Sequence, residues 1–393
     1  MRRTAEVVIV GGGCMGASLA WHLAQCGLTS VVLVERGAQL ASGSTGRNAG
    51  GVRHQFSQEA NVRLSLESIR AFERFEHEVG VAIDLHQDGY LFLLSNAVAE
   101  EEFRSSVALQ RRLGVEVDWL TPAEAARLAP GLAVEGVSAA TYCARDGICD
   151  PVGVTLAYAG AARRAGVVTL TETEVTGVRV RHGRLEGVDT TREPIDAPVV
   201  VNAAGPWARN LGRLAGLDVP VDPLRRHIFI ARPGAGGTWN DEPHRGRVPS
   251  TRIMVIDFET TFYCHREGPG LLFGMGDPAE RPGFDTTVRW DFLPDAIEVA
   301  TRRVPALADA AVSHAWAGLY EMTPDAMPLI GPAPELPGFY LLTGFSGHGF
   351  QHCPAAGRVL ADLVCGRDAG LDVRPFAPDR FAGRHGGGEH HVV

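Results

Sequence analysis

The sequence predicts a mixed α/β chain, α/β with α+β character, in which one domain is built from strand–turn–helix units and a second on an antiparallel sheet. Two observations predict the first domain. An apolar run at residues 7–10 leads into a glycine turn and a helical pattern, and the same succession returns at residues 339–366. A third observation predicts the second domain, because alternating, aromatic-bearing runs separated by Gly and Pro occur within residues 219–315.

The composition is that of a soluble globular protein and excludes several partners. The 393 residues are enough for two domains, and 45% of them are apolar and 21% charged. The net charge is −9 and the arginines are scattered, so no basic stripe is available for nucleic acid. No apolar stretch reaches the roughly 18 residues of a membrane span, and the strand at Val7 leaves no room for a signal sequence. We therefore expect a cytoplasmic protein without nucleic-acid or membrane partners.

The absence of lysine and the spacing of the cysteines exclude several reaction types and kinds of site. All 37 residues of the Lys+Arg count are arginines, so Schiff bases, pyridoxal attachment and a Walker-type phosphate lysine are impossible. The seven cysteines are dispersed and never form a C-x-x-C pair, which indicates neither a disulfide framework nor a zinc ribbon. We expect reduced, mostly buried thiols and no metal site.

The first glycine turn fits the pattern G-x-G-x-x-G between a short strand and a helix that ends near Gly27. In this pattern Gly11 allows the tight turn, Gly13 lets a pyrophosphate approach the backbone, and Gly16 lets the helix pack closely on the strand. The free N–H groups and the positive end of the helix would face the phosphates. A glycine-rich turn can also occur only because the backbone bends tightly there, with no ligand bound.

An acidic residue follows at the position that a dinucleotide site needs. The second strand, residues 30–34, ends at Glu35, nineteen residues after Gly16. An acidic side chain at this distance accepts hydrogen bonds from two ribose hydroxyls and disfavours a 2′-phosphate. Together with the turn, it predicts a Rossmann-like dinucleotide-binding domain.

Two further stretches favour FAD over NAD. The loop "SGSTGRNAGGVR" at residues 42–53 offers many backbone N–H groups to a flat, polar cofactor, although it could also be a flexible connection. The second turn, residues 344–350, opens another helix, whose N-terminus would stabilise the negative charge of a reduced flavin. An NAD-linked dehydrogenase would leave this second turn without a role.

These motifs together resemble the D-amino-acid-oxidase-type flavoproteins, in the branch of sarcosine oxidases, dimethylglycine dehydrogenases and the catalytic subunit of L-proline dehydrogenase complexes. The resemblance covers nearly the whole chain, and its motifs occur in the order that such proteins show. They are the glycine turn with Glu35, "STGRNAGGVRHQF" (44–56), "DGICDP" (146–151), "VVNAAGPWA" (200–208), "GLYEMTPDAMPLIG" (318–331) and "GFSGHGF" (344–350).

The resemblance implies a discontinuous FAD-binding domain interleaved with a substrate domain. The FAD-binding segments are expected at 1–83, 143–218 and 316–383, and the substrate segments at 84–142 and 219–315. The tail "RHGGGEHHVV", residues 384–393, is expected to be disordered; its histidines could otherwise bind a metal.

The resemblance also carries roles onto four residues near the substrate. Arg53 matches an arginine that binds a substrate carboxylate, or it forms a salt bridge within its loop. Tyr263 matches an aromatic residue that lines the substrate cavity, or it belongs to the sheet core. His348 would donate a hydrogen bond to the flavin or modulate its proton balance, or it satisfies loop carbonyls. Gln351 stands where relatives have a lysine that assists carboxylate binding.

The FAD contacts that the resemblance implies lie in the turns, the loop and the motifs named above, with Val175 in addition. They are Gly11, Gly13, Cys14, Met15, Gly16, Glu35, Arg36, Ser42, Ser44, Thr45, Arg47, Asn48, Ala49, Gly50, Gly51, Val175, Ala203, Ala204, Gly205, Trp207, Gly318, Tyr320, Ser346, Gly347, His348, Gly349, Phe350 and Gln351.

Three departures from the family pattern qualify the expected activity. The positions of the covalent flavin tethers correspond to Gly318 and to Arg47 or Asn48, so we expect non-covalent FAD. The lysine that promotes oxygen reaction falls near Leu272, which leaves oxidase and dehydrogenase open. The lysine replaced by Gln351 weakens the case for a small amino acid and permits a neutral or larger amine.

The sequence therefore predicts an FAD-dependent oxidoreductase that acts on a secondary or tertiary amine, such as an N-methyl or proline-like amino acid. Hydride would pass from the α- or methyl carbon to flavin N5, and the resulting imine would hydrolyse. Electrons would continue to oxygen or to a partner redox subunit. The alternative is a flavin-binding scaffold without turnover.

Overall fold

The computed structural model describes residues 3–234, 237–241, 244, 246–382 and 387–393. Within these ranges, no helix combines the length and the apolar character that crossing a membrane requires.

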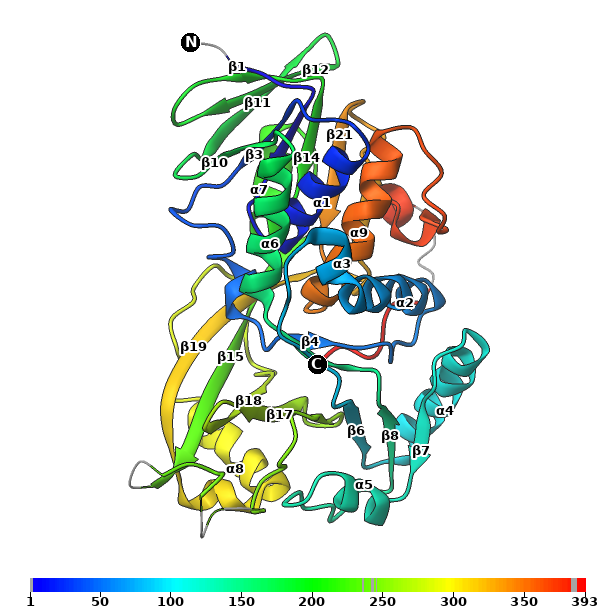
Figure 1. The fold of residues 1–393 in the computed structure, drawn as a ribbon, viewed down its shortest axis with the longest axis vertical. Coiled ribbons are helices and arrows are strands. Elements are labelled where there is room, and N and C mark those ends of the chain that lie inside the picture. Colours follow the sequence, from blue (N-terminus) through cyan, green and yellow to red (C-terminus); the bar gives the residue numbers. More distant parts are fainter. Residues whose placement is uncertain (1–2, 235–236, 242–243, 245, 383–386) are drawn as a thin grey trace.

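A six-stranded sheet forms the centre of the upper half of the molecule (Figure 1). Its order is β10-β3-β2-β14-β21-β20, parallel throughout except for β20, which runs antiparallel to β21. Both faces of this sheet are covered, which explains the unbroken apolar runs of β2 and β3. The strands are β2 (Val7–Val10), β3 (Val31–Val34), β10 (Val168–Leu170), β14 (Val199–Asn202), β20 (Leu329–Pro332) and β21 (Phe339–Thr343).

Helices pack on one face of this sheet, and a small sheet with one helix packs on the other. The first face carries α1 (Cys14–Gln25), α6 (Pro151–Arg164) and α9 (Gly349–Val364), with α2 (Glu59–Glu73) and α3 (Phe75–Val79) beside them. The second face carries the sheet β1-β13-β12-β11 and α7. These elements are β1 (Arg3–Thr4), β11 (Val175–Arg181), β12 (Arg184–Thr190), β13 (Ile195–Asp196) and α7 (Ala208–Leu214).

The register brings the carboxyl ends of the central strands to one edge. Val10 pairs with Val34 and with Asn202, so β2, β3 and β14 end side by side. Ligands of open parallel sheets bind outside this edge. The first glycine turn, Glu35 and the second glycine turn all follow strands that end there.

The lower half of the molecule is built on an eight-stranded sheet of order β19-β15-β18-β17-β16-β6-β8-β7 (Figure 1). The expectation of an antiparallel sheet needs one correction, because β16 and β6 run parallel. These two strands come from the two separate segments of the predicted domain, so no tight hairpin joins them. The strands are β6 (Tyr90–Leu94), β7 (Asp118–Leu120), β8 (Ala139–Cys143), β15 (Asp222–Pro233), β16 (Met254–Asp257), β17 (Phe262–Glu267), β18 (Gly270–Met275) and β19 (Ala310–Met322).

One face of the eight-stranded sheet packs on α5 (Pro122–Leu128) and α8 (Leu293–Arg303). The other face carries Tyr90, Ile228 and Tyr263, which also line the cavity described below. α4 (Ala97–Arg112) packs beside β6, and β4 (Gly51–Val52), β9 (Gly147–Cys149) and β5 (Leu85–His86) form a three-stranded sheet.

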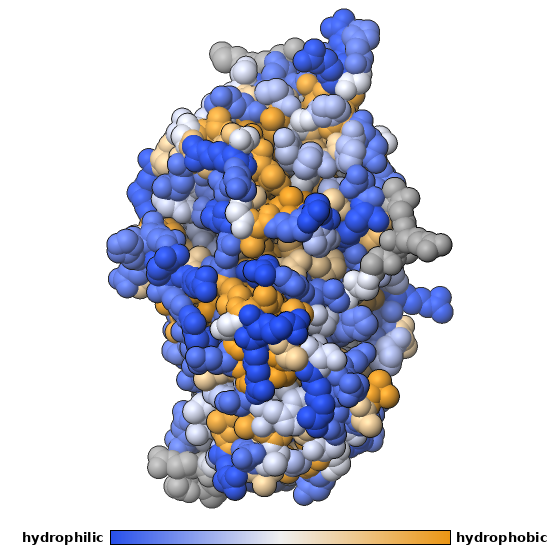
Figure 2. All heavy atoms as spheres, turned by 90° about the vertical axis from the view of Figure 1, so that its right-hand side faces the viewer, coloured by the Kyte–Doolittle hydropathy of each residue, from blue (hydrophilic) through white to orange (hydrophobic). Residues whose placement is uncertain are grey.

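The two large sheets draw their strands from interleaved parts of the chain, as the predicted segments do. β19, however, runs without a break from Ala310 to Met322 and so crosses the predicted boundary between residues 315 and 316. Figure 2 shows the face on the side of α9, α2 and α4, which is mostly hydrophilic with apolar patches along its middle.

Candidate functional site

A cavity of about 880 Å³ lies between the carboxyl edge of the six-stranded sheet and the open face of the eight-stranded sheet. This volume is within the range of cofactor and ligand sites. Both glycine turns, the loop of residues 42–53 and strands of both sheets contribute to it. Every residue that the sequence analysis assigned to cofactor or substrate lines this cavity, except Gly16 and Gly50.

The first turn has the close backbone packing that a pyrophosphate site needs. A Cβ atom on Gly11 would lie 2.2 Å from the carbonyl oxygen of Ala203, and one on Gly16 would lie 2.0 Å from the carbonyl oxygen of Gly11. A Cβ on Gly13 would meet only Thr45 Oγ1, at 3.0 Å. Gly11 and Gly16 therefore hold the turn together, whereas Gly13 keeps space open in front of the N-terminus of α1.

Glu35 lies at the same edge, beside an aromatic wall. Its carboxylate accepts hydrogen bonds from the N–H groups of Gly12 and Gly37, at 2.8 and 2.7 Å. Each carboxylate oxygen has a further lone pair, which a ribose hydroxyl can use. The guanidinium of Arg36 lies 3.7 Å from the ring centroid of Trp207. These groups fit the adenosine half of FAD.

The loop of residues 42–53 is fixed onto β19, which argues against a flexible connection. Ser44 Oγ donates to the carbonyl oxygen of Leu319 at 2.6 Å, and Trp316 Nε1 donates to the carbonyl oxygen of Arg47 at 3.0 Å. A Cβ on Gly318 would lie 3.0 Å from the Cβ of Arg47. Two of the positions that correspond to flavin tethers thus lie together, and neither offers a cysteine or histidine.

The second glycine turn opens into the same cavity beside the first. A Cβ on Gly349 would lie 3.5 Å from Met15 Cε, and Ser18 Oγ donates to the carbonyl oxygen of Cys353 at 2.7 Å. Gly347 has a φ of +95°, and a Cβ there would lie 2.3 Å from the ring of Tyr320. The N-terminus of α9 therefore faces the cavity next to the N-terminus of α1.

His348 is buried and belongs to a chain of neutral groups. Its Nε2 lies 3.0 Å from the carbonyl oxygen of Ala326, and its Nδ1 lies 3.2 Å from His352 Nδ1. His352 Nε2 lies 2.8 Å from Ser65 Oγ. Burial lowers the pKa of His348 to about 4, so the ring is neutral near pH 7. Both ring nitrogens have partners inside the protein, which favours the alternative in which His348 satisfies a loop carbonyl over hydrogen bonding to the flavin.

Arg53 is held from several sides. Its backbone N–H donates to Gln351 Oε1 at 2.8 Å. Its guanidinium donates to the carbonyl oxygens of Gln55 and His391 and lies 3.9 Å from the ring centroid of Phe56. It forms no ion pair with the acidic residues of the described ranges, so the alternative of a salt bridge within the loop does not hold. The side chain of Gln351 therefore contacts the backbone N–H of Arg53.

Asp146, from the motif "DGICDP", anchors the loop that carries Arg53. It is completely buried. Its Oδ1 accepts from the backbone N–H of His54 at 2.8 Å and lies 2.7 Å from His54 Nδ1, and its Oδ2 accepts from Gln55 Nε2 at 3.1 Å. His54, Cys143 and Asp146 also form a buried group whose ligand atoms lie within 4.8 Å of one another. Within this group, His54 Nδ1 lies 2.7 Å from Asp146 Oδ1 and 3.9 Å from Cys143 Sγ.

Three tyrosines line the open face of the eight-stranded sheet: Tyr90 from β6, Tyr263 from β17 and Tyr320 from β19. Burial raises the pKa of all three phenols, so they stay protonated and can donate hydrogen bonds. Only Tyr263 and Tyr320 were predicted. Tyr90 and Arg226, which also line the cavity, were missed.

The C-terminal residues are ordered inside the cavity, so the prediction of a disordered tail is wrong for residues 387–393. Val392 and Val393 line the cavity, and Tyr320 Oη donates to the carbonyl oxygen of Val393 at 2.9 Å. The ring of His391 stacks on Phe103 at 4.0 Å. Figure 1 places the C-terminus at the centre of the molecule, beside β4. Residues 384–386 lie outside the described ranges.

Glu389 holds this segment at the start of α2. Its carboxylate accepts from the N–H groups of Ser57 and Gln58, at 2.9 and 3.2 Å, and from Asn61 Nδ2 at 2.9 Å. Burial alone would raise the pKa of Glu389. The neighbouring His391 and the hydrogen bonds from Ser57 and Asn61 outweigh burial and lower this pKa to about 2.

Glu389→Gln is expected to destabilise the fold by about 1–3 kcal/mol at pH 7, because the buried network loses the negative charge and one of the two acceptor oxygens. The pKa of Glu389 is lower in the folded than in the unfolded chain, so its contribution is complete above about pH 4.5 and is lost between about 4.5 and 2. Thermal unfolding midpoints at pH 7, 5, 4 and 3 test this. The gap between variant and wild type should shrink as the pH falls, and exposed Glu59→Gln should show almost no gap. A constant gap would contradict the assignment.

Comparison with known proteins supports the use of this cavity for FAD. Residues 6–363 match the family model described as DAO, FAD dependent oxidoreductase. The chain is 30% identical over 394 residues to mitochondrial dimethylglycine dehydrogenase of Mus musculus, covering 96% of this chain and 44% of that protein. It is 32% identical over 395 residues to mitochondrial sarcosine dehydrogenase of Homo sapiens, covering 95% of this chain and 41% of that protein. The chain thus spans less than half the length of these two relatives.

A solved structure matches over its full length. The crystal structure of L-proline dehydrogenase from P. horikoshii has a TM-score of 0.88 and 34% identity, with 97% of this chain and 99% of that chain covered. The glycine turns, Glu35 and the fixed loop thus lie in a fold shared with flavin enzymes. The chain belongs to the DAO family of FAD-dependent oxidoreductases.

Proposed function

We propose that the chain oxidises the C–N bond of a secondary or tertiary amine of the amino-acid type. The observation that carries the proposal is the cavity itself. In it, the N-termini of α1 and α9 lie opposite a sheet face that carries Tyr90, Tyr263, Tyr320 and Arg226. The relatives named for dimethylglycine, sarcosine and L-proline support the substrate class.

Bound FAD would supply the hydride acceptor, and the protein would supply position. The buried hydroxyl of Tyr263 can donate a hydrogen bond to the carboxylate of the substrate. The hydroxyl of Tyr320 already donates to Val393 and offers the substrate an acceptor. His348 stays neutral near pH 7 because burial lowers its pKa to about 4, so it adds no charge there. Orientation of a neutral amine above a flat oxidant supplies most of what this reaction needs.

The electron acceptor is oxygen or a partner redox subunit. No lysine occurs in the chain, and the lysine that promotes oxygen reaction in sarcosine oxidases would fall near Leu272, which supports slow reaction with oxygen. Mixing the anaerobically reduced protein with oxygen in a stopped-flow instrument distinguishes the two. The seven cysteines are all free, which supports a reducing compartment such as the cytoplasm.

The proposal is tested by anaerobic addition of N-methyl amino acids, proline and D-amino acids to the FAD-loaded protein. We expect at least one secondary or tertiary amine to bleach the visible flavin absorption. Stable FAD with no bleaching by any of them would favour the alternative, a flavin-binding scaffold. A protein that takes up no FAD would contradict both.

A further inference from the structure

Two arginines line the part of the cavity next to the open face of the eight-stranded sheet. Arg53 comes from the loop after β4, and Arg226 comes from β15. The charges of both act on Tyr320: burial raises the pKa of this phenol, and Arg226 and Arg53 each lower it. The two cations therefore lie within electrostatic reach of one phenol.

The two arginines differ in how many hydrogen bonds their guanidinium groups donate to the protein. Arg53 donates to the carbonyl oxygens of Gln55 and His391. Arg226 donates through one terminal nitrogen to the carbonyl oxygen of Arg225 at 3.3 Å, and its Nε is buried without a partner in the described structure. Leaving a buried donor unpaired costs about 1–3 kcal/mol, more when it is charged. The protein therefore leaves part of the Arg226 guanidinium without a hydrogen-bond acceptor. A bound ligand can supply one.

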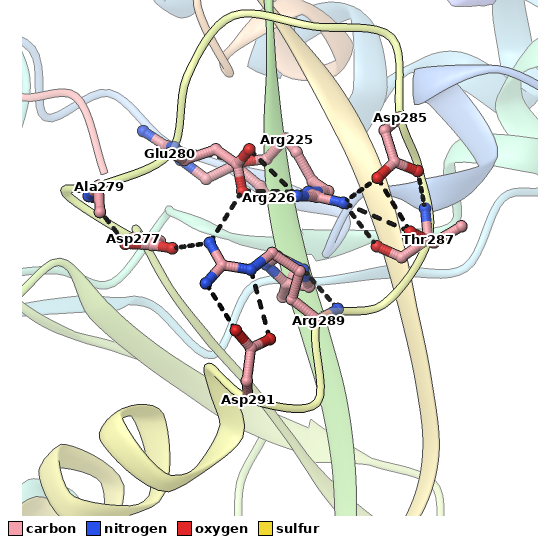
Figure 3. Close-up of polar contacts among 10 residues, drawn as sticks. Arg225, Arg226, Asp277, Ala279, Glu280, Asp285, Thr287, Arg289 and Asp291 are labelled. Carbon is pink, nitrogen blue, oxygen red and sulfur yellow. Dashed lines mark hydrogen bonds and ion pairs between the residues drawn. The ribbon is translucent and has the colours of Figure 1, made fainter.

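The acidic residues of the loop between β18 and α8 do not neutralise Arg226, because they form ion pairs with other arginines (Figure 3). The pairs are Arg225 with Glu280 and Asp285, at 3.0 and 2.6 Å, and Arg289 with Asp277 and Asp291, at 2.7 and 3.0 Å. Arg225 and Arg226 are neighbours on a strand and point to opposite faces of the sheet. No ion pair joins Arg226 to an acid within the described ranges.

The surroundings of Arg226 leave room for a ligand. In β19 its register partner is Gly318, and a Cβ on Gly276 would lie 3.6 Å from its guanidinium carbon. Its guanidinium carbon lies 5.1 Å from the ring centroid of Tyr320. Two glycines and a phenol thus surround a planar fork of donors, which matches the geometry of a carboxylate.

We propose that Arg226, rather than Arg53, is the residue that binds the carboxylate of the amine substrate. This inference rests on the proposed amine oxidation. It makes Arg226 the determinant that separates amino-acid substrates from amines without a carboxylate. Arg53, whose guanidinium bonds to the carbonyl oxygens of Gln55 and His391, instead holds the C-terminal segment against the cavity wall.

Binding of a ligand that cannot be turned over tests this independently of catalysis. Pyrrole-2-carboxylate has an aromatic ring and no hydrogen on the carbon that bears its carboxylate, so it cannot lose hydride there, and pyrrole-2-carboxamide is its neutral counterpart. Each is titrated into FAD-loaded wild type, Arg226→Leu, Arg226→Lys and Arg281→Leu, and the change in flavin absorption is followed. Arg281 is exposed, does not line the cavity and follows Glu280 in the loop between β18 and α8, so it controls for the loss of one charge.

We expect Arg226→Leu to weaken carboxylate binding by about 30-fold or more and to leave amide binding unchanged. Arg226→Lys should recover part of the affinity, and Arg281→Leu should stay within about twofold of wild type. FAD content and unfolding midpoint verify that each variant is folded.

Three results would overturn the inference: equal carboxylate binding by wild type and Arg226→Leu, equal loss of carboxylate and amide, or no preference of wild type for the carboxylate. Failure of the amine panel to bleach the flavin would refute the proposed function and leave this binding result standing.

Discussion

Gly13→Val is expected to weaken FAD binding by at least about 100-fold, or about 2.7 kcal/mol, with little effect on the fold. Gly13 has an ordinary φ of −79°, so a side chain is tolerated by the backbone. A Cβ there meets only Thr45 Oγ1, at 3.0 Å, and displacing this oxygen costs no more than its hydrogen bond from the N–H of Cys14. The valine methyl groups would instead fill the space that the pyrophosphate needs at the N-terminus of α1. Fluorescence titration of the apoprotein with FAD measures the loss.

Gly160→Ala is the matched control for this variant. Gly160 lies within α6 and does not line the cavity, and a Cβ there has its nearest neighbour, Arg164, at 3.6 Å. This control should keep full FAD affinity and be slightly more stable. If Gly13→Val binds FAD as tightly as wild type, the cofactor does not approach the first glycine turn.

Asp146→Ala is expected to destabilise the protein by about 3–5 kcal/mol, because it leaves buried donors of His54 and Gln55 without their acceptor. The same loss should release the loop that positions Arg53, so turnover should also fall. Asp146→Asn retains an acceptor for the His54 N–H and should cost clearly less. Urea unfolding at pH 7 measures both variants.

The chain contains a second His–Asp pair that serves as a control. His86 and Asp84 lie 2.6 Å apart, with 64% of the Asp84 side chain exposed, whereas His54 and Asp146 lie 2.7 Å apart with Asp146 at 0%. Asp84→Ala should cost less than about 1 kcal/mol. Equal losses for Asp146→Ala and Asp84→Ala would show that the buried pair does not anchor the loop.

The part of the site that the sequence predicted is the part that backbone geometry dictates. Gly11 and Gly16 leave no room for a Cβ, so the local pattern of glycines is enough to indicate the turn. The position of Glu35 could be predicted from its distance along the chain. A strand, a helix and a second strand separate it from the start of the domain, and they bring it back to the same edge of the sheet.

Arg226 was missed for a different reason. The pattern of residues 222–233 shows which side chains share a face of β15, but it does not show which face meets the cofactor. Arg225 and Arg226 are therefore equivalent candidates in the sequence. Only the packing of α8 against the face of Phe229 leaves Arg226 toward the cavity.

The prediction for the C-terminal tail was wrong because the residues that hold residues 387–393 in place lie far away in the sequence. Three glycines at residues 386–388 and two histidines after them are typical of a mobile end. The acceptor role of Glu389 depends on donors of Ser57 and Asn61, more than three hundred residues earlier in the chain. No local pattern reports such a partner.

A crystal structure of the FAD-loaded protein tests most directly the claim that one cavity receives the dinucleotide from both glycine turns. We predict the pyrophosphate at Gly13 and the isoalloxazine ring between residues 346–350 and the face of Tyr263 and Tyr320. An FAD bound outside this cavity, or with its ring directed away from that sheet face, would contradict the account.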